Sequence, residues 1–189
     1  MTRNAERDSP PVASLIDHTQ LLSSDDVARA LRRMAHEILE RNTDEEPLLV
    51  IGLQTGGVPF AARLVEVLDA IGEHSVTLGQ LDVAFYRDDL DHRPIHQSTT
   101  TSLPLDLTER VVLIVDDVLF TGRTIRAALH ALSEWGRPRS IQLAVMIDRG
   151  HRELPIRPDY VGKNLPTGRR ESIIANLDGV WIGTDGPAR

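Results

Sequence analysis

The chain has 189 residues, of which 41% are hydrophobic and 26% are charged, and its net charge is −7 at pH 7. These values are typical of one ordinary globular domain and exclude a protein that is basic throughout. Cysteine is absent and the longest apolar runs are about five residues, which excludes disulfides, thiolate metal sites and a membrane-spanning helix and favours a cytoplasmic protein. We expect residues 1–13 to form a flexible tail and residues 14–189 a single domain.

Strands and helices are expected to alternate along the chain. Ser23 and the acids after it can cap a helix whose apolar residues recur at helical spacing. The expected strands are continuously apolar instead of alternating, which indicates a parallel sheet covered on both faces and hence a doubly wound α/β fold. The expected strands cover residues 48–53, 76–85, 111–115 and 141–147, and the expected helices cover residues 27–42, 58–71 and 123–135.

The remaining segments have weaker patterns. Residues 88–101 are polar and without periodicity, as in a functional loop. A short strand is possible over 159–161, and residues 173–182 can form a strand or a hairpin. Residues 137–170 hold eight Lys or Arg against three Asp or Glu, so this segment carries about +5 and is either a solvated surface or a site for a polyanion.

Residues 111–124 read VVLIVDDVLFTGRT, an apolar strand followed by two adjacent carboxylates and a Thr-Gly-Arg-Thr turn. Ligands of an open parallel sheet bind beyond the carboxyl ends of its strands. Two adjacent acids there need hydrogen-bond donors or a cation, and ribose hydroxyls are suitable donors. The glycine and the following helix N-terminus can hold an anion. The stretch therefore predicts a ribose 5-phosphate site, with a simple helix cap as the alternative, while the absence of a GxxxxGK[ST] motif disfavours a P-loop.

This stretch resembles the 5-phosphoribosyl 1-diphosphate (PRPP) signature of type I phosphoribosyltransferases. Three other stretches are similar to the bifunctional pyrimidine operon attenuators and uracil phosphoribosyltransferases: RRMAHEILERN (32–42), LDVAFYRDDL (81–90) and GRPRSIQLAVMIDRGHRELPIRPDYVGKNLPT (136–167). The resemblance implies a mainly parallel doubly wound sheet with a small hood, formed by about residues 150–175 and the C-terminal strand region. It also implies synthesis of UMP and diphosphate from uracil and PRPP, and disfavours a purine enzyme.

The resemblance also assigns site residues. Asp116, Asp117 and Arg87 would be catalytic, with Arg87 in a mobile loop that begins at residues 86–89. Magnesium would be held mainly by PRPP, without dedicated protein ligands. PRPP and UMP would bind Thr55, Gly56, Gly57, Asp116, Asp117, Val118, Leu119, Phe120, Thr121, Gly122, Arg123 and Thr124. The base hood would use Lys163, Asn164, Leu165 and Ile173.

One residue departs from the family pattern. The loop that receives the pyrophosphate usually reads Thr-Arg-Gly, whereas here Gly56 stands at the arginine position. A charge-assisted contact to phosphate contributes about 1.5 to 3 kcal/mol, so its loss would weaken PRPP binding or turnover by about one to two orders of magnitude. The alternative hypothesis is therefore an RNA-binding, nucleotide-sensing regulator with weak or no catalysis.

The family resemblance implies a second partner, a stem-loop in pyrimidine operon messenger RNA. UMP would promote this binding and thereby favour transcription termination. Cationic side chains would contact phosphates, although for His36 alone an ordinary place on a helix surface is the alternative. The resemblance further implies a homodimer or a higher homo-oligomer. The positions that match the RNA face are Arg32, His36, His151, Arg152, Arg157 and Lys163.

Overall fold

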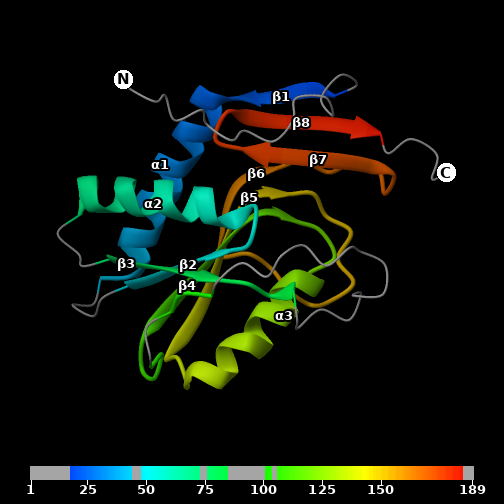
Figure 1. Cartoon of the computed structure of the whole chain (residues 1–189). Helices are drawn as coiled ribbons and strands as arrows, with labels where there is room; N and C mark the ends of the chain where they lie inside the picture. Colours follow the sequence, from blue (N-terminus) through cyan, green and yellow to red (C-terminus); the bar gives the residue numbers. More distant parts are fainter. Residues whose placement is uncertain (1–17, 44–47, 73–75, 85–100, 104–105, 185–189) are drawn as a thin grey trace, which may run out of the picture.

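The computed structural model describes residues 18–43, 48–72, 76–84, 101–103 and 106–184, which form two sheets and three α-helices (Figure 1). The tail expected over residues 1–13, the proposed catalytic Arg87 and most of the loop expected over residues 88–101 lie outside the described residues.

The main sheet has five strands in the order β3-β2-β4-β5-β6, and every pair of neighbours is parallel. The chain adds β3 on one side of β2 and then returns to place β4 on the other side. The strand order therefore reverses between β2 and β4, which is where a doubly wound sheet binds its ligands. The strands are β2 (Leu48–Leu53), β3 (Val76–Leu81), β4 (Val111–Leu119), β5 (Ser140–Asp148) and β6 (Tyr160–Asn164).

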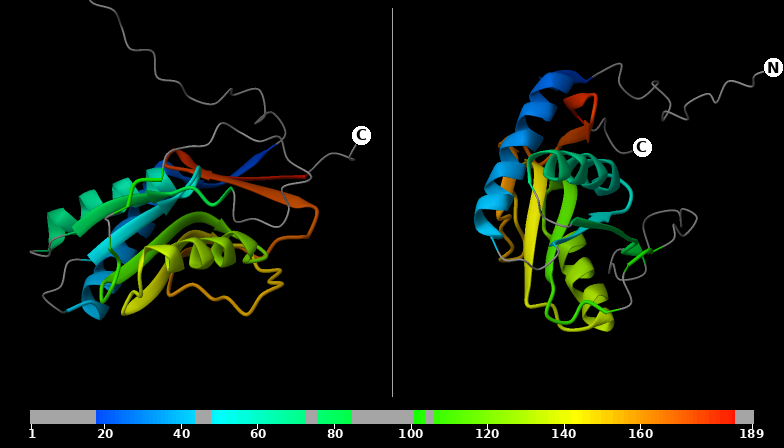
Figure 2. Two further views of the ribbon diagram at one scale, coloured as in Figure 1. Left: turned by 60° about the horizontal axis from the view of Figure 1, so that its bottom comes forward. Right: turned by 90° about the vertical axis from the view of Figure 1, so that its left-hand side faces the viewer.

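Helices cover both faces of this sheet, as the continuous apolar runs predict. Val50 and Leu113 belong to the core on the side of α1 and α2, while Leu49 and Ile114 belong to the core on the side of α3. Successive side chains of a strand point to opposite faces, so both faces must be apolar. Figure 2, at right, shows α1 and α3 on opposite sides of the strands. The helices are α1 (Ser24–Arg41), α2 (Gly57–Ile71) and α3 (Arg123–Leu132).

A second, antiparallel sheet joins the two ends of the described chain, in the order β1-β8-β7. Its strands are β1 (Thr19–Ser23), β7 (Glu171–Asn176) and β8 (Gly179–Thr184). Of the two alternatives for the C-terminal region, the hairpin is the one observed. Strand β1 was not predicted, and Ser23 at its end caps α1 through a capping box with Asp26.

Several element boundaries differ from the sequence-based expectation. β4 does not end at Val115 but continues through Leu119, because β5 keeps pairing with it as far as Asp148. β3 ends at Leu81, four residues earlier than expected. α3 ends at Leu132 and is followed by a 3-10 turn, η4 (Ser133–Trp135).

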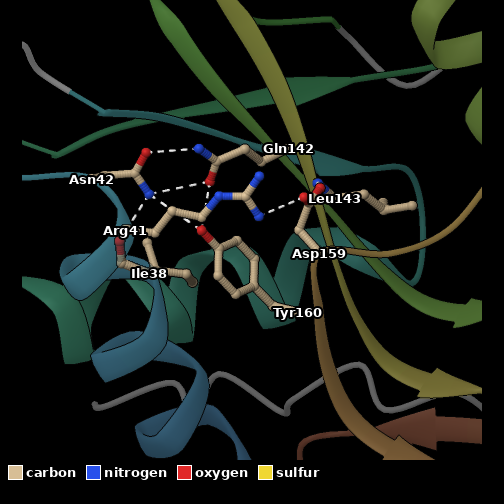
Figure 3. Close-up of polar contacts among 7 residues, drawn as sticks. All are labelled: Ile38, Arg41, Asn42, Gln142, Leu143, Asp159 and Tyr160. Carbon is tan, nitrogen blue, oxygen red and sulfur yellow. Dashed lines mark hydrogen bonds and ion pairs between the residues drawn. The ribbon is translucent and has the colours of Figure 1, made fainter.

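A polar network links the C-terminal end of α1 to β5 and β6 (Figure 3). The Asn42 and Gln142 amides exchange hydrogen bonds, with Gln142 Nε2 at 2.7 Å from Asn42 Oδ1, and the Tyr160 hydroxyl donates to Gln142 Oε1 at 2.7 Å. Arg41 forms an ion pair with Asp159 at 2.6 Å. Buried polar groups without partners cost about 1 to 3 kcal/mol each, so this network fixes the helix against the amino-terminal end of the sheet.

Within the described part of the chain, no helix has the length and apolar character needed to cross a membrane.

Candidate active site

The two adjacent acids lie where β4 loses one of its two neighbours. β2 pairs with β4 only as far as Val115, whereas β5 continues beside Asp116 and Asp117. Each carboxylate accepts the next backbone amide: the Asp117 N–H donates to Asp116 Oδ1 at 3.0 Å, and the Val118 N–H donates to Asp117 Oδ1 at 2.7 Å. Burial raises the pKa of Asp117. The pair is thus held on a rigid strand at the point where the strand order reverses.

The loop after β2 fills the space that β2 leaves beside the acids. A Cβ atom added at Gly56 would lie 2.1 Å from Asp117 Oδ2, and one at Gly57 would lie 2.2 Å from Val115 O. Glycine thus lets the backbone of the loop approach the Asp117 carboxylate at position 56 and the backbone of β4 at position 57. The loop proposed to bind pyrophosphate and the two acids proposed to bind the ribose therefore touch. The peptide bond from Gln54 to Thr55 within this loop is cis.

The third part of the site is the turn between β4 and α3. Gly122 has φ +91°, a left-handed conformation that favours glycine, and α3 begins at Arg123. The Arg123 N–H lies 3.4 Å from the Thr121 hydroxyl. The first amides of a helix lack partners within the helix and attract anions. The turn can therefore hold a phosphate a few residues from the acid pair, in the order that the sequence predicts.

Residues 148–156, which we call the clasp, fold back onto this turn. The backbone N–H of Arg149 donates to Leu119 O at 3.1 Å, and the backbone N–H of Glu153 donates to Thr121 O at 3.0 Å. The Glu153 carboxylate pairs with Arg123 at 2.8 Å. This contact is not predictable from the sequence, because the groups that the clasp holds are mostly backbone carbonyls, which every residue type has.

Arg149 links the turn to the segment before β7. The central carbon of its guanidinium lies 4.2 Å from the centre of the Phe120 ring, and the residue is 7% exposed. It donates to Thr167 Oγ1 at 3.0 Å and to the carbonyl oxygens of Gly168 and Glu171. Cation–π contacts strengthen when desolvated, so Arg149 fixes the Phe120 ring. In the sequence, Arg149 stands out only as one cation of a basic segment.

The proposed hood residues come from two sheets. Lys163 and Asn164 end β6 of the main sheet and are exposed, Leu165 packs partly buried against the core, and Ile173 lies on β7. The Leu165 N–H donates to Asp148 O at 2.9 Å, which ties this group to the clasp.

The six positions proposed for RNA binding divide into two sets. Arg32 and His36 are exposed on α1, and Arg157 and Lys163 are exposed as well. Helix α1 lies along β6, where Arg33 donates to the carbonyl oxygens of Val161 and Gly162.

The other two positions point inward. His151 Nε2 contacts Thr167 O, and its ring lies edge-on to Phe120 at 5.8 Å between centroids. The Arg152 guanidinium is bound inside the clasp. Because the Arg152 guanidinium is bound inside the clasp, residues 137–170 present less positive charge to solvent than the value of about +5 counted from the sequence.

A pocket of about 520 Å³ lies away from these residues, at the amino-terminal end of the strands. Its walls include Leu39, Arg139 and Gln142. In the described chain no group of three or more His, Cys, Asp or Glu side chains is placed to hold a metal ion. The chemistry points instead to the acid pair, where two carboxylates, a glycine loop and a helix N-terminus meet.

Comparison with known proteins agrees with this geometry. The family model for the phosphoribosyl transferase domain matches residues 17–176. The "Bifunctional protein PyrR" of Brevibacillus brevis is 52% identical over 164 residues, which cover 86% of this chain and 92% of the relative. The protein of the same name from Deinococcus radiodurans is 54% identical over 160 residues, covering 83% and 86% of the two chains.

Solved structures share the fold at low sequence identity. A hypoxanthine phosphoribosyltransferase variant from Trypanosoma cruzi, solved as a ternary complex with substrates, has a TM-score of 0.70 at 21% identity, covering 89% of this chain and 95% of that one. A hypoxanthine phosphoribosyltransferase from Staphylococcus aureus has a TM-score of 0.68 at 19% identity, and the match covers 95% of this chain and 98% of that one. The type I phosphoribosyltransferase fold is thus confirmed. The chain belongs to the phosphoribosyltransferase family and, within it, to the bifunctional PyrR proteins.

Proposed function

We propose that the chain is a uracil phosphoribosyltransferase that also binds RNA and attenuates pyrimidine biosynthesis genes. The observation that carries the catalytic half is the contact between the acid pair on β4 and the glycine loop after β2, at the point where the strand order reverses. The choice of uracil rests on the resemblance of residues 136–167 to the uracil-using branch of the family, and its PyrR relatives are bifunctional by name.

In the reaction, N1 of uracil forms a bond to the anomeric carbon of PRPP, the bond from this carbon to diphosphate breaks, and the N1 proton is released. The turn at Thr121 to Thr124 holds the 5-phosphate, and the loop at Thr55 to Gly57 receives the pyrophosphate. Asp116 and Asp117 accept hydrogen bonds from the ribose hydroxyls. Their negative charge stabilises the positive charge that develops on the ribose in an oxocarbenium-like transition state. Because both acids sit on a paired strand, their orientation requires little reorganisation during the reaction.

The site suits magnesium that arrives with the substrate. Magnesium prefers oxygen ligands and keeps few protein ligands when phosphates are present. The diphosphate and ribose oxygens of PRPP would supply most of the ligands, and the negative charge of the two carboxylates nearby suits a cation held in this way. When bound, the ion neutralises charge on the leaving diphosphate.

The RNA half of the proposal rests on the exposed cations. Arg157 and Lys163 follow the clasp, and Arg32 and His36 lie on the helix that packs along β6. Such side chains supply the phosphate contacts that RNA binding needs. We place a pyrimidine operon stem-loop on this surface, in a homodimer or higher homo-oligomer, with UMP promoting the binding.

A second candidate function is a nucleotide-sensing RNA regulator with little catalysis. The observation that favours it is the place of Gly56, where the family usually has arginine and where the Asp117 carboxylate now occupies the space beside the Cα atom.

One assay separates the two functions. Purified protein is incubated with PRPP, magnesium and labelled uracil, with hypoxanthine, guanine and orotate as competing bases. We expect UMP and diphosphate from uracil alone. If no UMP forms but UMP still binds and tightens RNA binding, the regulator is the function; if hypoxanthine is consumed instead, the uracil assignment is wrong.

A further inference from the structure

Arg152 lies inside the clasp and not among the exposed cations. Its Nη2 atom pairs with Asp148 Oδ2 at 2.6 Å, and the two side chains are 21% and 18% exposed. Its Nε atom donates to Ile156 O at 3.0 Å. Its Nη1 atom lies 2.7 Å from Phe120 O and 3.2 Å from Gly150 O. A guanidinium has five donors in a fixed planar fork and can serve this whole set, whereas an ammonium group cannot.

The clasp holds three consecutive carbonyl groups of the turn after β4. Leu119 O accepts from the Arg149 N–H, Phe120 O accepts from the Arg152 guanidinium, and Thr121 O accepts from the Glu153 N–H. The middle one is the shortest contact and is made by the Arg152 side chain, which also lies 3.4 Å from Leu119 O, whereas Leu119 O and Thr121 O each accept a backbone amide. Arg152 is therefore the residue whose replacement can release one carbonyl while the backbone contacts on either side remain.

Fixing these carbonyls also fixes the amides that follow them. In a trans peptide the C=O of one residue and the N–H of the next point to opposite sides of the chain. The carbonyls of Leu119, Phe120 and Thr121 face the clasp, so the amides of the next residue in each case face away from it. Successive amides turned to one side form a concavity that attracts anions, and α3 begins directly after it.

We propose that Arg152 is a positioning residue for the ribose 5-phosphate turn, and that it affects RNA binding only through the nucleotide held there. This differs from the expectation that Arg152 contacts RNA itself, because the structure shows its guanidinium bound to Asp148 and to backbone carbonyls. The inference rests on the proposed function, since it assumes that PRPP binds at this turn.

The first arm of the test measures PRPP binding. With Arg152→Gln we expect the PRPP dissociation constant, measured by calorimetry in the presence of magnesium, and the KM for PRPP to rise about tenfold or more. We expect kcat to change less than about threefold, because the acid pair is untouched. The PRPP affinity of Arg152→Lys should lie between that of wild type and that of Arg152→Gln. Asp148→Asn removes the ion pair but leaves the contacts of Arg152 to the carbonyls. We therefore expect it to lower PRPP affinity less than Arg152→Gln does.

The second arm measures RNA binding without nucleotide over a range of salt concentrations. The slope of log affinity against log salt should be the same for Arg152→Gln as for wild type. For Arg157→Gln the slope should fall by about 0.7 to 0.9, as expected for one lost phosphate contact. A reduced slope for Arg152→Gln, or an unchanged PRPP dissociation constant, would overturn the inference.

The outcomes also distinguish the inference from the proposed function. A wild-type protein that makes no UMP but binds PRPP overturns only the catalytic half, and the calorimetric comparison of the Arg152 variants still decides the inference. A wild-type protein that does not bind PRPP overturns both. If thermal unfolding shows that Arg152→Gln is not folded, the same comparison is made with Arg152→Lys, for which an unchanged PRPP affinity overturns the inference.

Discussion

Replacing Asp116 and Asp117 together by asparagine is expected to lower kcat/KM for PRPP by about 10²- to 10⁴-fold. Each carboxylate loses a charge-assisted hydrogen bond to a ribose hydroxyl, worth about 1.5 to 3 kcal/mol, and each 1.36 kcal/mol corresponds to a factor of about ten in rate. The loss is concentrated in the transition state, where positive charge develops on the ribose. The measurement is the initial rate of diphosphate release with PRPP, magnesium and uracil.

The double variant is expected to stay folded. Burial raises the pKa of Asp117 above its ordinary value of 3.8, so the folded state binds this proton more tightly than the unfolded state. The contribution of Asp117 to the free energy of unfolding is then greatest below pH 3.8 and falls as the pH rises through the folded-state pKa. Above the folded-state pKa the ionised carboxylate opposes folding, and asparagine at position 117 removes that effect. The thermal unfolding temperature at pH 7.5 should therefore not decrease.

Asp178 supplies the matched control. It is exposed in the turn between β7 and β8, and Asp178→Asn should leave the kinetics unchanged. Wild-type kinetics for the Asp116 and Asp117 double variant would contradict the assignment of this pair to the ribose.

Replacing Gly56 by alanine is expected to lower kcat/KM by about 10- to 100-fold. The new Cβ atom would lie 2.1 Å from Asp117 Oδ2, so either the carboxylate or the loop must move by about 1 Å or more. A displacement of about 1 Å at a reacting group costs up to about 10²-fold in rate. The measurement is the kinetics of UMP formation over a range of PRPP concentrations.

Gly168→Ala is the control, because its added Cβ atom would lie 3.4 Å from Glu171 Oε2, a distance that small movements can accommodate. We expect less than about a threefold change. Gly56→Arg brings the guanidinium common in the family but carries the same Cβ atom, and we expect no gain over wild type. A Gly56→Arg variant more active than wild type would show that Asp117 does not need the space beside Gly56.

The main sheet was predictable because its strands are buried on both faces. Such strands are apolar on both faces over most of their length, so β2, β4 and β5 contain continuous apolar runs. β1 left no such signal, since most of its five side chains are exposed and its partner, β8, lies at the other end of the chain. The two acids suggested that β4 ends at Val115, but the pairing of its backbone with β5 continues regardless of side-chain polarity.

The candidate active site also has a part that the sequence predicts and a part that it does not. The acid pair and the turn after it form a contiguous motif, so their order along the chain predicts their chemistry. The clasp could not be predicted, because Arg152 and Arg149 bind mostly backbone oxygens, and any sequence with a similar loop supplies these. Gly56 was recognised as a missing arginine, but only the structure shows that the Asp117 carboxylate lies against its Cα atom.

The most direct measurement is a crystal structure of the protein with UMP. We expect the 5-phosphate on the backbone amides between Thr121 and Thr124, and both ribose hydroxyls within hydrogen-bond distance of Asp116 or Asp117. The uracil ring should lie on the side of Lys163 and Ile173. If the phosphate of UMP binds elsewhere, for instance in the pocket beside Gln142, or if its ribose does not contact the acid pair, the proposed active site is wrong.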